Sequence, residues 1–208
     1  RPAARPGGAV HPRALAVSAR MSTPAPPVTR HGVFMRVWGL GVLLTGDSGV
    51  GKSELALELL ARGHPLVADD ATEFVRQGPH VIGHCPEVIS GFLEARSLGI
   101  LNIRKIFGPR SVIQSAALGL MIALDPPPDP ERPWWSDGME RIMGRRETVR
   151  LCGVDLPRLS IPIRVGHNLA VLVETACRDQ QIRNGGYRAD RDFAARQLRA
   201  IRQTQSDL

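Results

Sequence analysis

The chain has 208 residues, of which 43% are hydrophobic and 23% are charged, a composition that fits one globular domain with an ordinary core. Its longest apolar runs, such as residues 116–124, are too short to cross a bilayer, and no signal peptide is evident at the N-terminus. The sequence therefore predicts a protein that is not bound to a membrane.

The formal net charge of +7 would suit a nucleic-acid-binding protein, but its distribution argues against that class. Residues 1–30 carry five Arg and no acidic residue, so residues 31–208 hold 22 basic and 20 acidic side chains. Because the remaining charge is nearly balanced, the folded part has no electrostatic reason to bind nucleic acid.

Three cysteines, Cys85, Cys152 and Cys177, are far apart, and no CxxC pair occurs. An odd number of scattered cysteines is atypical of a disulfide framework or a zinc ribbon. They are predicted to be buried thiols in a reducing cytoplasm.

The predicted elements begin after a leader. Residues 1–30 are rich in Pro, Ala, Arg and Gly without a hydrophobic period, which predicts disorder, with Met21 as a candidate start. A folded domain is expected over residues 31–208. Strands are predicted at residues 33–38, 41–45, 66–68, 73–76, 81–83, 116–124, 149–151 and 159–163. Helices are predicted at 53–62, around 169–176 and at 190–203; 93–107 is left open between loop and helix, and the Pro-rich segment 125–137 is predicted to be loop.

The two C-terminal helices are predicted from their apolar residues. In the first, a period of three and four places Leu169, Leu172, Val173 and Ala176 on one face. In the second, the residues available for packing are Phe193, Leu198 and Ile201.

A glycine-rich segment after the second predicted strand matches the phosphate-binding pattern G-x-x-x-x-G-K-[ST]. Its glycines let backbone N–H groups close around phosphate oxygens, and the following helix directs its positive dipole end at the same anion. Lys52 would reach the β- and γ-phosphates, and the Ser53 hydroxyl is a hard oxygen ligand suited to Mg²⁺. The motif predicts that ATP and Mg²⁺ are bound by Gly46, Asp47, Ser48, Gly49, Val50, Gly51, Lys52 and Ser53.

Two carboxylates, Asp69 and Asp70, follow the predicted strand at 66–68 at a distance from the P-loop that suits a Walker-B-like position. One carboxylate can hold the metal, and the other can take the proton from an attacking hydroxyl. The alternative interpretation is that paired acids simply end a strand in a polar turn.

Beyond the P-loop, the chain resembles the C-terminal catalytic domain of HPr kinase/phosphorylase over about residues 31–200. The resemblance rests on separate stretches in the same order, at residues 31–33, 39–45, 62–70, 93–102, 140–144 and 161–168. It implies a P-loop α/β domain with a mixed sheet and C-terminal helices, related in fold to phosphoenolpyruvate carboxykinase.

The resemblance also implies a reaction and partners. Such enzymes use ATP or pyrophosphate, with Mg²⁺, to phosphorylate a serine of HPr, the small phosphocarrier protein of the phosphotransferase system. They also remove that group with inorganic phosphate and release pyrophosphate. They act in the cytoplasm, regulate carbon metabolism and form homohexamers.

Active-site roles carry over by position. The resemblance implies that Asp70 accepts the proton in phosphorylation and donates it in the reverse reaction. Lys52 and Ser53 keep their P-loop roles, and Glu94 corresponds to a second magnesium ligand beside Asp69. From the residues alone, Glu94 could equally belong to an exposed charge pair with its neighbour two positions on.

Two further active-site residues depend on the resemblance. His31 corresponds to a histidine near the phosphates, although alone it would be interpreted as an ordinary strand-edge histidine. Arg141 corresponds to an arginine that stabilises the transferring group, although its charged neighbours alone would indicate a solvated face. Residues 162–167 correspond to the segment linked to dephosphorylation.

The sequence departs from the family pattern at three points. The family's usual N-terminal domain has no counterpart in the residues before His31. Ser97 stands where Gly is usual, and a Gly chosen for an unusual backbone angle would make Ser a strained substitute. His167 stands where Arg is usual, which replaces a permanent charge by a titratable one.

Two other functions are consistent with the motifs. A P-loop kinase could act on a small-molecule acceptor, and only acceptor assays separate that function from protein phosphorylation. A non-catalytic module could bind ATP and report it to a partner. Retention of Asp70, Glu94 and Arg141 argues against this last function.

Overall fold

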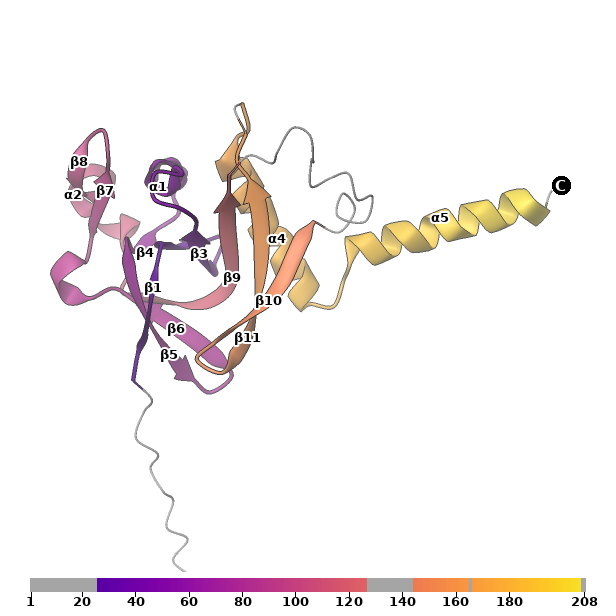
Figure 1. Ribbon diagram of the computed structural model, residues 1–208, viewed down its shortest axis with the longest axis horizontal. Helices are drawn as coiled ribbons and strands as arrows, with labels where there is room; N and C mark the ends of the chain where they lie inside the picture. Colours follow the sequence, from indigo (N-terminus) through magenta and orange to yellow (C-terminus); the bar gives the residue numbers. More distant parts are fainter. Residues whose placement is uncertain (1–25, 127–143, 165, 207–208) are drawn as a thin grey trace, which may run out of the picture.

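The computed structural model describes residues 26–126, 144–164 and 166–206. Its strands are β1 (Val28–His31), β2 (Val33–Val37), β3 (Leu40–Thr45), β4 (Leu66–Ala68), β5 (Ala71–Gln77), β6 (His80–His84), β7 (Phe92–Ala95), β8 (Gly99–Asn102), β9 (Ser115–Asp125), β10 (Arg145–Leu151) and β11 (Val154–Pro162). Its helices are α1 (Lys52–Ala61), α2 (Ile103–Phe107), α4 (Leu169–Asn184) and α5 (Ala189–Ser206), with 3₁₀ turns η1 (Glu87–Ile89) and η2 (Pro109–Ser111). The α/β class with a mixed sheet and C-terminal helices is confirmed (Figure 1).

The long strand β9 organises the main sheet. The sheet follows the order β1-β5-β6-β9-β3-β2-β4, and β11 pairs with β9 and carries β10. Strands β3 and β11 both run parallel to β9, whereas β6 runs antiparallel to it. Because β3, β9 and β11 point the same way, their carboxyl ends meet at one edge, where ligands bind in open α/β sheets.

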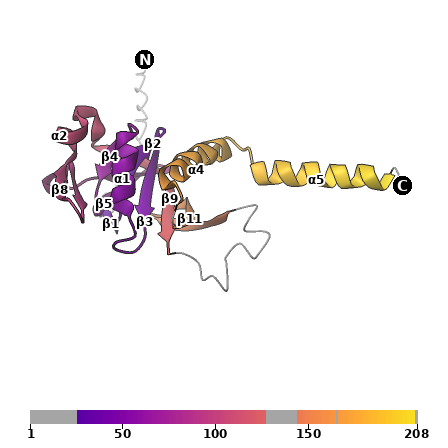
Figure 2. The ribbon, with the colours of Figure 1, turned by 90° about the horizontal axis from the view of Figure 1, so that it is seen from above.

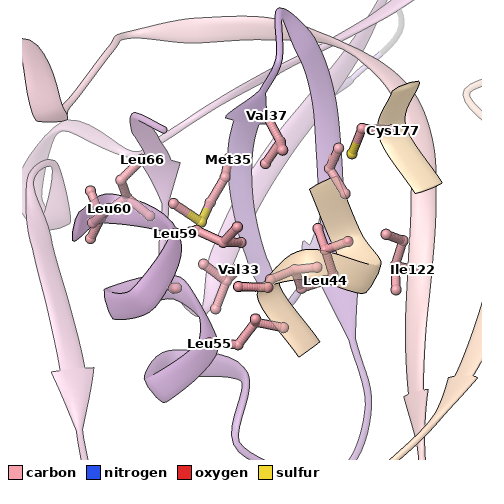
Figure 3. Close-up of a cluster of buried hydrophobic side chains, with 14 of the residues drawn as sticks. Val33, Met35, Val37, Leu44, Leu55, Leu59, Leu60, Leu66, Ile122 and Cys177 are labelled. Carbon is pink, nitrogen blue, oxygen red and sulfur yellow. The ribbon is translucent and has the colours of Figure 1, made fainter. Parts of the chain in front are cut away.

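Strands β2 and β3 are buried on both faces because their side chains alternate between two apolar clusters. Val33 and Met35 pack beneath α1 and α4 (Figure 3). Phe34 and Leu43 point to the other face, where the Phe34 ring meets Phe74 edge-on with centroids 5.3 Å apart. Apolar runs of this kind are typical of strands that are covered on both sides.

Strand β1 corrects the predicted boundary of the leader. Residues 28–30 were expected to be disordered, but they form β1, which pairs antiparallel with β5 from Val28↔Phe74 to His31↔Ala71. The side chains of β1 are mostly exposed, so the strand carries no apolar period that sequence analysis could detect. The segment 93–107, left open between loop and helix, forms the β7–β8 hairpin followed by α2.

The two C-terminal helices differ in how far they follow the prediction. On α4, Val173 and Ala176 are buried as predicted and Leu169 packs against the same cluster. Leu172 is 40% exposed instead, and Ala170 and Cys177 complete the buried face. On α5, the three residues expected to be available for packing are each about half exposed, because this helix extends away from the domain (Figures 1 and 2). Within the described ranges, no helix combines the length and apolar character needed to cross a membrane.

An ion-pair cluster holds α4 against the C-terminal end of α1. The Glu174 carboxylate accepts a hydrogen bond from Arg62 at 2.5 Å and contacts His64 Nε2 at 2.7 Å. The His64 ring stands edge-on to Trp38, and the Arg178 guanidinium lies 4.0 Å from the centre of the Trp38 ring. The Arg62 hydrogen bond is the main reason that the pKa of Glu174 falls to about 2.

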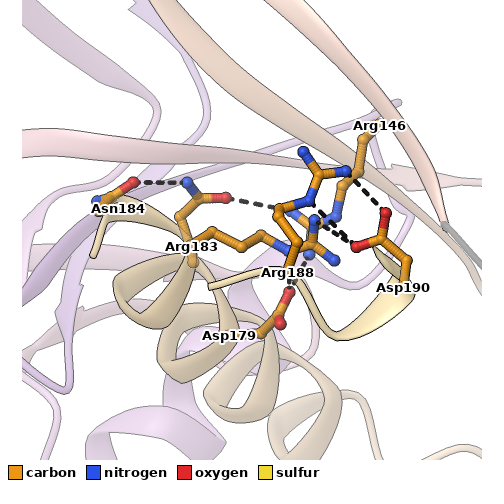
Figure 4. A network of polar contacts seen from close by, with 7 residues as sticks. Arg146, Asp179, Arg183, Asn184, Arg188 and Asp190 are labelled. Carbon is orange, nitrogen blue, oxygen red and sulfur yellow. Dashed lines mark hydrogen bonds and ion pairs between the residues drawn. The ribbon is translucent and has the colours of Figure 1, made fainter. Parts of the chain in front are cut away.

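A second polar network ties α4 to β10 and to the start of α5 (Figure 4). Asp179 accepts hydrogen bonds from Arg146 at 2.7 Å and from Arg183 at 2.6 Å. Asp190 pairs with Arg183 and Arg188 at 3.3 Å and 2.9 Å, and the Arg188 hydrogen bond lowers the pKa of Asp190 to about 2. This network sets the direction in which α5 leaves the domain.

We expect Glu174→Gln to lower the free energy of unfolding by about 1–3 kcal/mol at neutral pH, because it removes a largely buried charged acceptor. The pKa of Glu174 is about 2 in the folded state against an ordinary 4.5. The wild-type advantage is therefore complete above the ordinary value and is lost as pH falls through about 2. Urea unfolding of both proteins across this range measures it.

A matched control is Glu147→Gln, since Glu147 also pairs with an arginine, Arg158, but its side chain is 54% exposed. An exposed pair contributes about 0–1 kcal/mol, so this variant should unfold almost like the wild type. A stability difference for Glu174→Gln that did not shrink at low pH would contradict the assigned ion pair.

Candidate functional site

The P-loop joins the carboxyl end of β3 to the start of α1. Gly46, Gly49 and Gly51 have φ values of 141°, 85° and 96°, a range that glycine adopts far more readily than other residues. A Cβ on Gly46 would lie 2.6 Å from the carbonyl oxygen of Leu124, near the end of β9. The loop therefore passes too close to the neighbouring parallel strand to carry a side chain there.

The start of α1 provides donors for an anion. Gly51 occupies the N-cap position, and no side chain in the described part of the chain caps the first N–H groups. Such groups, with the helix dipole, favour phosphate at a helix N-terminus. Lys52 Nζ donates to the carbonyl oxygens of Gly46 and Asp47, both at 2.8 Å, so the ammonium group lies along the loop that would surround the phosphates.

The two carboxylates of the β4–β5 turn have different environments. Asp69 is half-buried, and its Oδ2 accepts the backbone N–H of Glu94 at 2.8 Å. Burial raises the pKa of Asp69, opposed by backbone hydrogen bonds from Glu94 and Asp70. Asp70 is exposed and has a φ of 63°. The turn thus holds one carboxylate in place and leaves the other accessible.

His31 reaches the site because β1 pairs with β5. The register places His31 opposite Ala71, directly after the Asp69–Asp70 turn. Its Nδ1 lies 3.5 Å from Asp70 Oδ1, and both side chains are more than 80% exposed. Water screens a pair this exposed, so it contributes little to stability, but the geometry brings an imidazole beside the accessible carboxylate.

The β7–β8 hairpin supplies a third side of the site. The Glu94 side chain is exposed on β7 and lines the same cleft as the P-loop. Two positions on, the Arg96 guanidinium donates to Ser48 Oγ at 2.9 Å and lies against Gly49. The hairpin is therefore hydrogen-bonded both to the P-loop and to the β4–β5 turn.

Together these segments enclose a cleft of about 310 Å³. The cleft is lined by His31, Gly32, Gly46, Ser48, Gly49, Gly51, Lys52, Ser53, Glu54, Asp69, Asp70, Glu94 and Arg96. Of the sequence-predicted site residues, Asp47 and Val50 belong to the loop but do not line the cleft. Arg141 lies outside the described residues.

Sequence analysis missed three lining residues, Gly32, Glu54 and Arg96. For Arg96 a signal was present, because alternate residues of a strand share one face. The sequence analysis left residues 93–107 open between loop and helix; a predicted strand there would have placed Arg96 on the same face as Glu94. Gly32 and Glu54 carry no comparable signal, since one is a link between strands and the other an ordinary acidic residue in a first helical turn.

The structure also locates Ser97 and His167, the two single-residue departures from the family pattern. Ser97 lies in the turn of the β7–β8 hairpin, and it is absent from the described residues that have positive φ. The expected backbone strain at Ser97 is therefore wrong, and the left-handed position of this turn is Gly99, with φ 78°. His167 lines a separate groove of about 570 Å³ between β11 and α4, together with Arg164.

A glycine loop between a buried strand and a helix, faced by two carboxylates, defines this chain as a P-loop nucleotide-binding domain of the α/β class. The model of the HPr serine kinase C-terminal domain family matches residues 23–197. The chain therefore belongs to the HPr serine kinase C-terminal domain family.

Individual relatives agree with this assignment. An HPr kinase/phosphorylase of Burkholderia multivorans is 45% identical over 183 residues, which is 88% of this chain and 55% of the relative. An HPr kinase/phosphorylase of Paraburkholderia phymatum matches equally well. The chain thus spans about half the length of these curated relatives. The structure of the HPr(Ser) kinase/phosphatase from Coxiella burnetii is 34% identical, with a TM-score of 0.69, and the match covers 80% of this chain and 98% of that one.

We expect Gly46→Ala to destabilise the protein by about 2–4 kcal/mol, because its Cβ would collide with rigid backbone at a φ that alanine rarely adopts. Gly63→Ala is the matched control, since Gly63 also has a positive φ, 89°, but nothing lies within 4 Å of its added Cβ. Thermal and urea unfolding measure both variants. Equal losses in the two would show that the close approach to β9 is not what the loop requires.

Proposed function

We propose that this chain is the catalytic domain of a Mg²⁺-dependent protein-serine kinase/phosphorylase that acts on HPr. The observation that carries the proposal is the position of Asp70, an accessible carboxylate on the wall of the P-loop cleft. An acceptor hydroxyl beside Asp70 would also lie next to a γ-phosphate held by the P-loop. The names of the relatives, HPr kinase/phosphorylase, support HPr as the acceptor.

The donor atoms of the cleft fit Mg²⁺ bound together with a nucleotide. No group of three or more His, Cys, Asp or Glu among the described residues could hold a metal alone. Ser53, Asp69 and Glu94 offer a hydroxyl and two carboxylates on the cleft wall, and Mg²⁺ commonly binds one or two carboxylates plus substrate phosphates and water. These three residues would hold the ion, which would supply charge neutralisation at the phosphates.

The forward reaction follows from the residues around the cleft. The serine oxygen forms a bond to the γ-phosphorus of ATP, and the bond from that phosphorus to the β,γ-bridging oxygen breaks, so that ADP leaves. Asp70 accepts the proton of the serine hydroxyl as general base. Lys52 and the backbone N–H groups of the P-loop stabilise negative charge on the phosphates. His31, 3.5 Å from Asp70, positions this carboxylate.

The reverse reaction uses the same groups. An oxygen of inorganic phosphate forms a bond to the phosphorus of phosphoserine, the bond to the serine oxygen breaks, and Asp70 returns the proton to that oxygen. The products are pyrophosphate and unmodified HPr. Arg141 and the segment 162–167 are proposed to assist transfer by analogy with the family. His167 lines the groove beside α4 and replaces the arginine that is usual in the segment linked to dephosphorylation. Phosphorolysis is therefore the reaction that this substitution would change most.

The wider role follows from the same proposal. The domain would run from the first strand at residue 28 to the end of the chain, assemble as a homohexamer and act in the cytoplasm. By phosphorylating HPr it would regulate the phosphotransferase system and carbon metabolism.

Transfer of label from γ-labelled ATP to purified HPr, with Mg²⁺, tests the proposal directly. We expect labelled HPr that releases its label as pyrophosphate after inorganic phosphate is added. Labelling without release would leave a kinase alone. Nucleotide binding without any labelling of HPr would overturn the protein acceptor and favour a small molecule or a regulatory module.

The general base is tested by Asp70→Asn, which preserves shape but cannot accept the proton. We expect kcat for HPr phosphorylation to fall about 10²- to 10⁴-fold, with the Kd of Mg·ATP little changed. Lys52→Ala should instead weaken nucleotide binding and lower both reactions. Rapid-quench assays and nucleotide titration separate the two effects. Undiminished transfer by Asp70→Asn would require a different base.

A further inference from the structure

The two faces of the β7–β8 hairpin differ in character. Leu93 and Ala95 point inward and are only 1% and 3% exposed, packed in the cluster that includes α1. Alternate residues of a strand point to opposite faces, so Phe92 and Glu94 point outward. The hairpin is therefore fixed to the domain by one face and presents the other to solvent, at one end of the domain in Figure 2.

The outward face begins at the cleft and continues as apolar surface. Ile100 of β8 is the direct cross-strand partner of Glu94, and such partners share one face with Cβ atoms about 4.5–5.5 Å apart. Ile100 is 75% exposed, Leu98 in the hairpin turn is 67% exposed and Phe92 is 42% exposed. We call these three residues the outer hairpin patch. A single exposed apolar residue is ordinary, but here three are gathered beside a catalytic-site carboxylate.

Hydrogen bonds fix the position of the outer hairpin patch relative to the cleft. The backbone N–H of Glu94 donates to Asp69, and the Arg96 guanidinium donates to Ser48 of the P-loop. Anything that packs on the patch is thereby placed at a fixed distance from the phosphate site and from Asp70.

We propose that the outer hairpin patch binds the protein that carries the acceptor serine; this inference rests on the proposed function. For proton transfer the serine hydroxyl must come within about 2.6–3.2 Å of the Asp70 carboxylate. A protein whose serine reaches that point must cover the rim of the cleft, where Ile100 stands. A small-molecule acceptor would fit within the cleft of about 310 Å³ and leave the patch uncovered.

The chemistry of the rim favours an apolar contact over a charged one. The cleft itself is lined by charged side chains and glycines, which serve the phosphates and give a protein partner little apolar area to bury. Protein interfaces gain much of their affinity from a few well-buried anchors surrounded by polar groups. Ile100, with Leu98 and Phe92, is such an anchor at the position the acceptor protein must occupy.

The test compares Ile100→Ser with the wild type in the full chain. We expect the KM for HPr to rise roughly tenfold, since burial of most of one isoleucine side chain is lost, while the KM for Mg·ATP changes less than about twofold. Ile100→Val keeps most of the apolar surface and should stay within about threefold of the wild type. The matched control is Ile182→Ser, at a 52% exposed isoleucine on α4, which should not change the KM for HPr.

Four outcomes would overturn the inference, and they differ from one another. HPr labelled by Ile100→Ser with the wild-type KM would show that the patch does not contact the acceptor. Equal rises in the KM for HPr and for Mg·ATP would indicate that Ile100 only supports the cleft. A changed sedimentation coefficient would assign the patch to contact with a second copy. Failure of the wild type itself to label HPr would reject the proposed function first, before any variant is compared.

Discussion

The parallel pairing of β3 with β9 is the constraint on which the rest of the structure depends. It brings the carboxyl ends of both strands to one edge, with Thr45 opposite Ala123, and the P-loop must leave β3 past the backbone of Leu124. Both strands are buried on two faces, so other elements must pack against each face. The helices α1 and α4 pack against one face, and the distant strands of the curled sheet pack against the other. The path of the glycine loop is thus a consequence of how the sheet is buried.

Apolar packing alone would not fix the position of α4, since its buried residues are mostly small. Charged groups supply the directional contacts that small apolar residues lack. Glu174 fastens the middle of α4 to the end of α1, and Asp179 fastens its last turns to β10. Both carboxylates are shielded enough for their arginine partners to matter, unlike the exposed pairs on the β10–β11 hairpin. Polar contacts therefore fix the orientation that apolar packing leaves undetermined.

The sequence predicted most of the fold because its signals were local. The loop at 46–53, the apolar runs of β3 and β9 and the acids after β4 each carry their own pattern, and the structure places all three as expected. Sequence analysis failed where pairing between strands that are far apart in the chain decides the secondary structure. The strand β1 is polar and exposed and exists only because β5 pairs with it. The β7–β8 hairpin buries just Leu93 and Ala95 on one face, too few for a period, so Arg96 was not connected to the P-loop.

The same long-range pairing accounts for the conformation of Asp70. A non-glycine residue at φ 63° is sparsely populated and costs of order 1 kcal/mol or more, although Asp tolerates it better than most. Two backbone hydrogen bonds maintain this conformation of Asp70. The N–H of Gly32 donates to the Asp70 carbonyl at 3.1 Å, and the N–H of Ala71 donates to the Asp69 carbonyl at 2.8 Å. Gly32 is held in turn by β1 and β2, which flank it. The turn separates two adjacent carboxylates, so that Asp69 points to the backbone of the hairpin while Asp70 projects into the cleft.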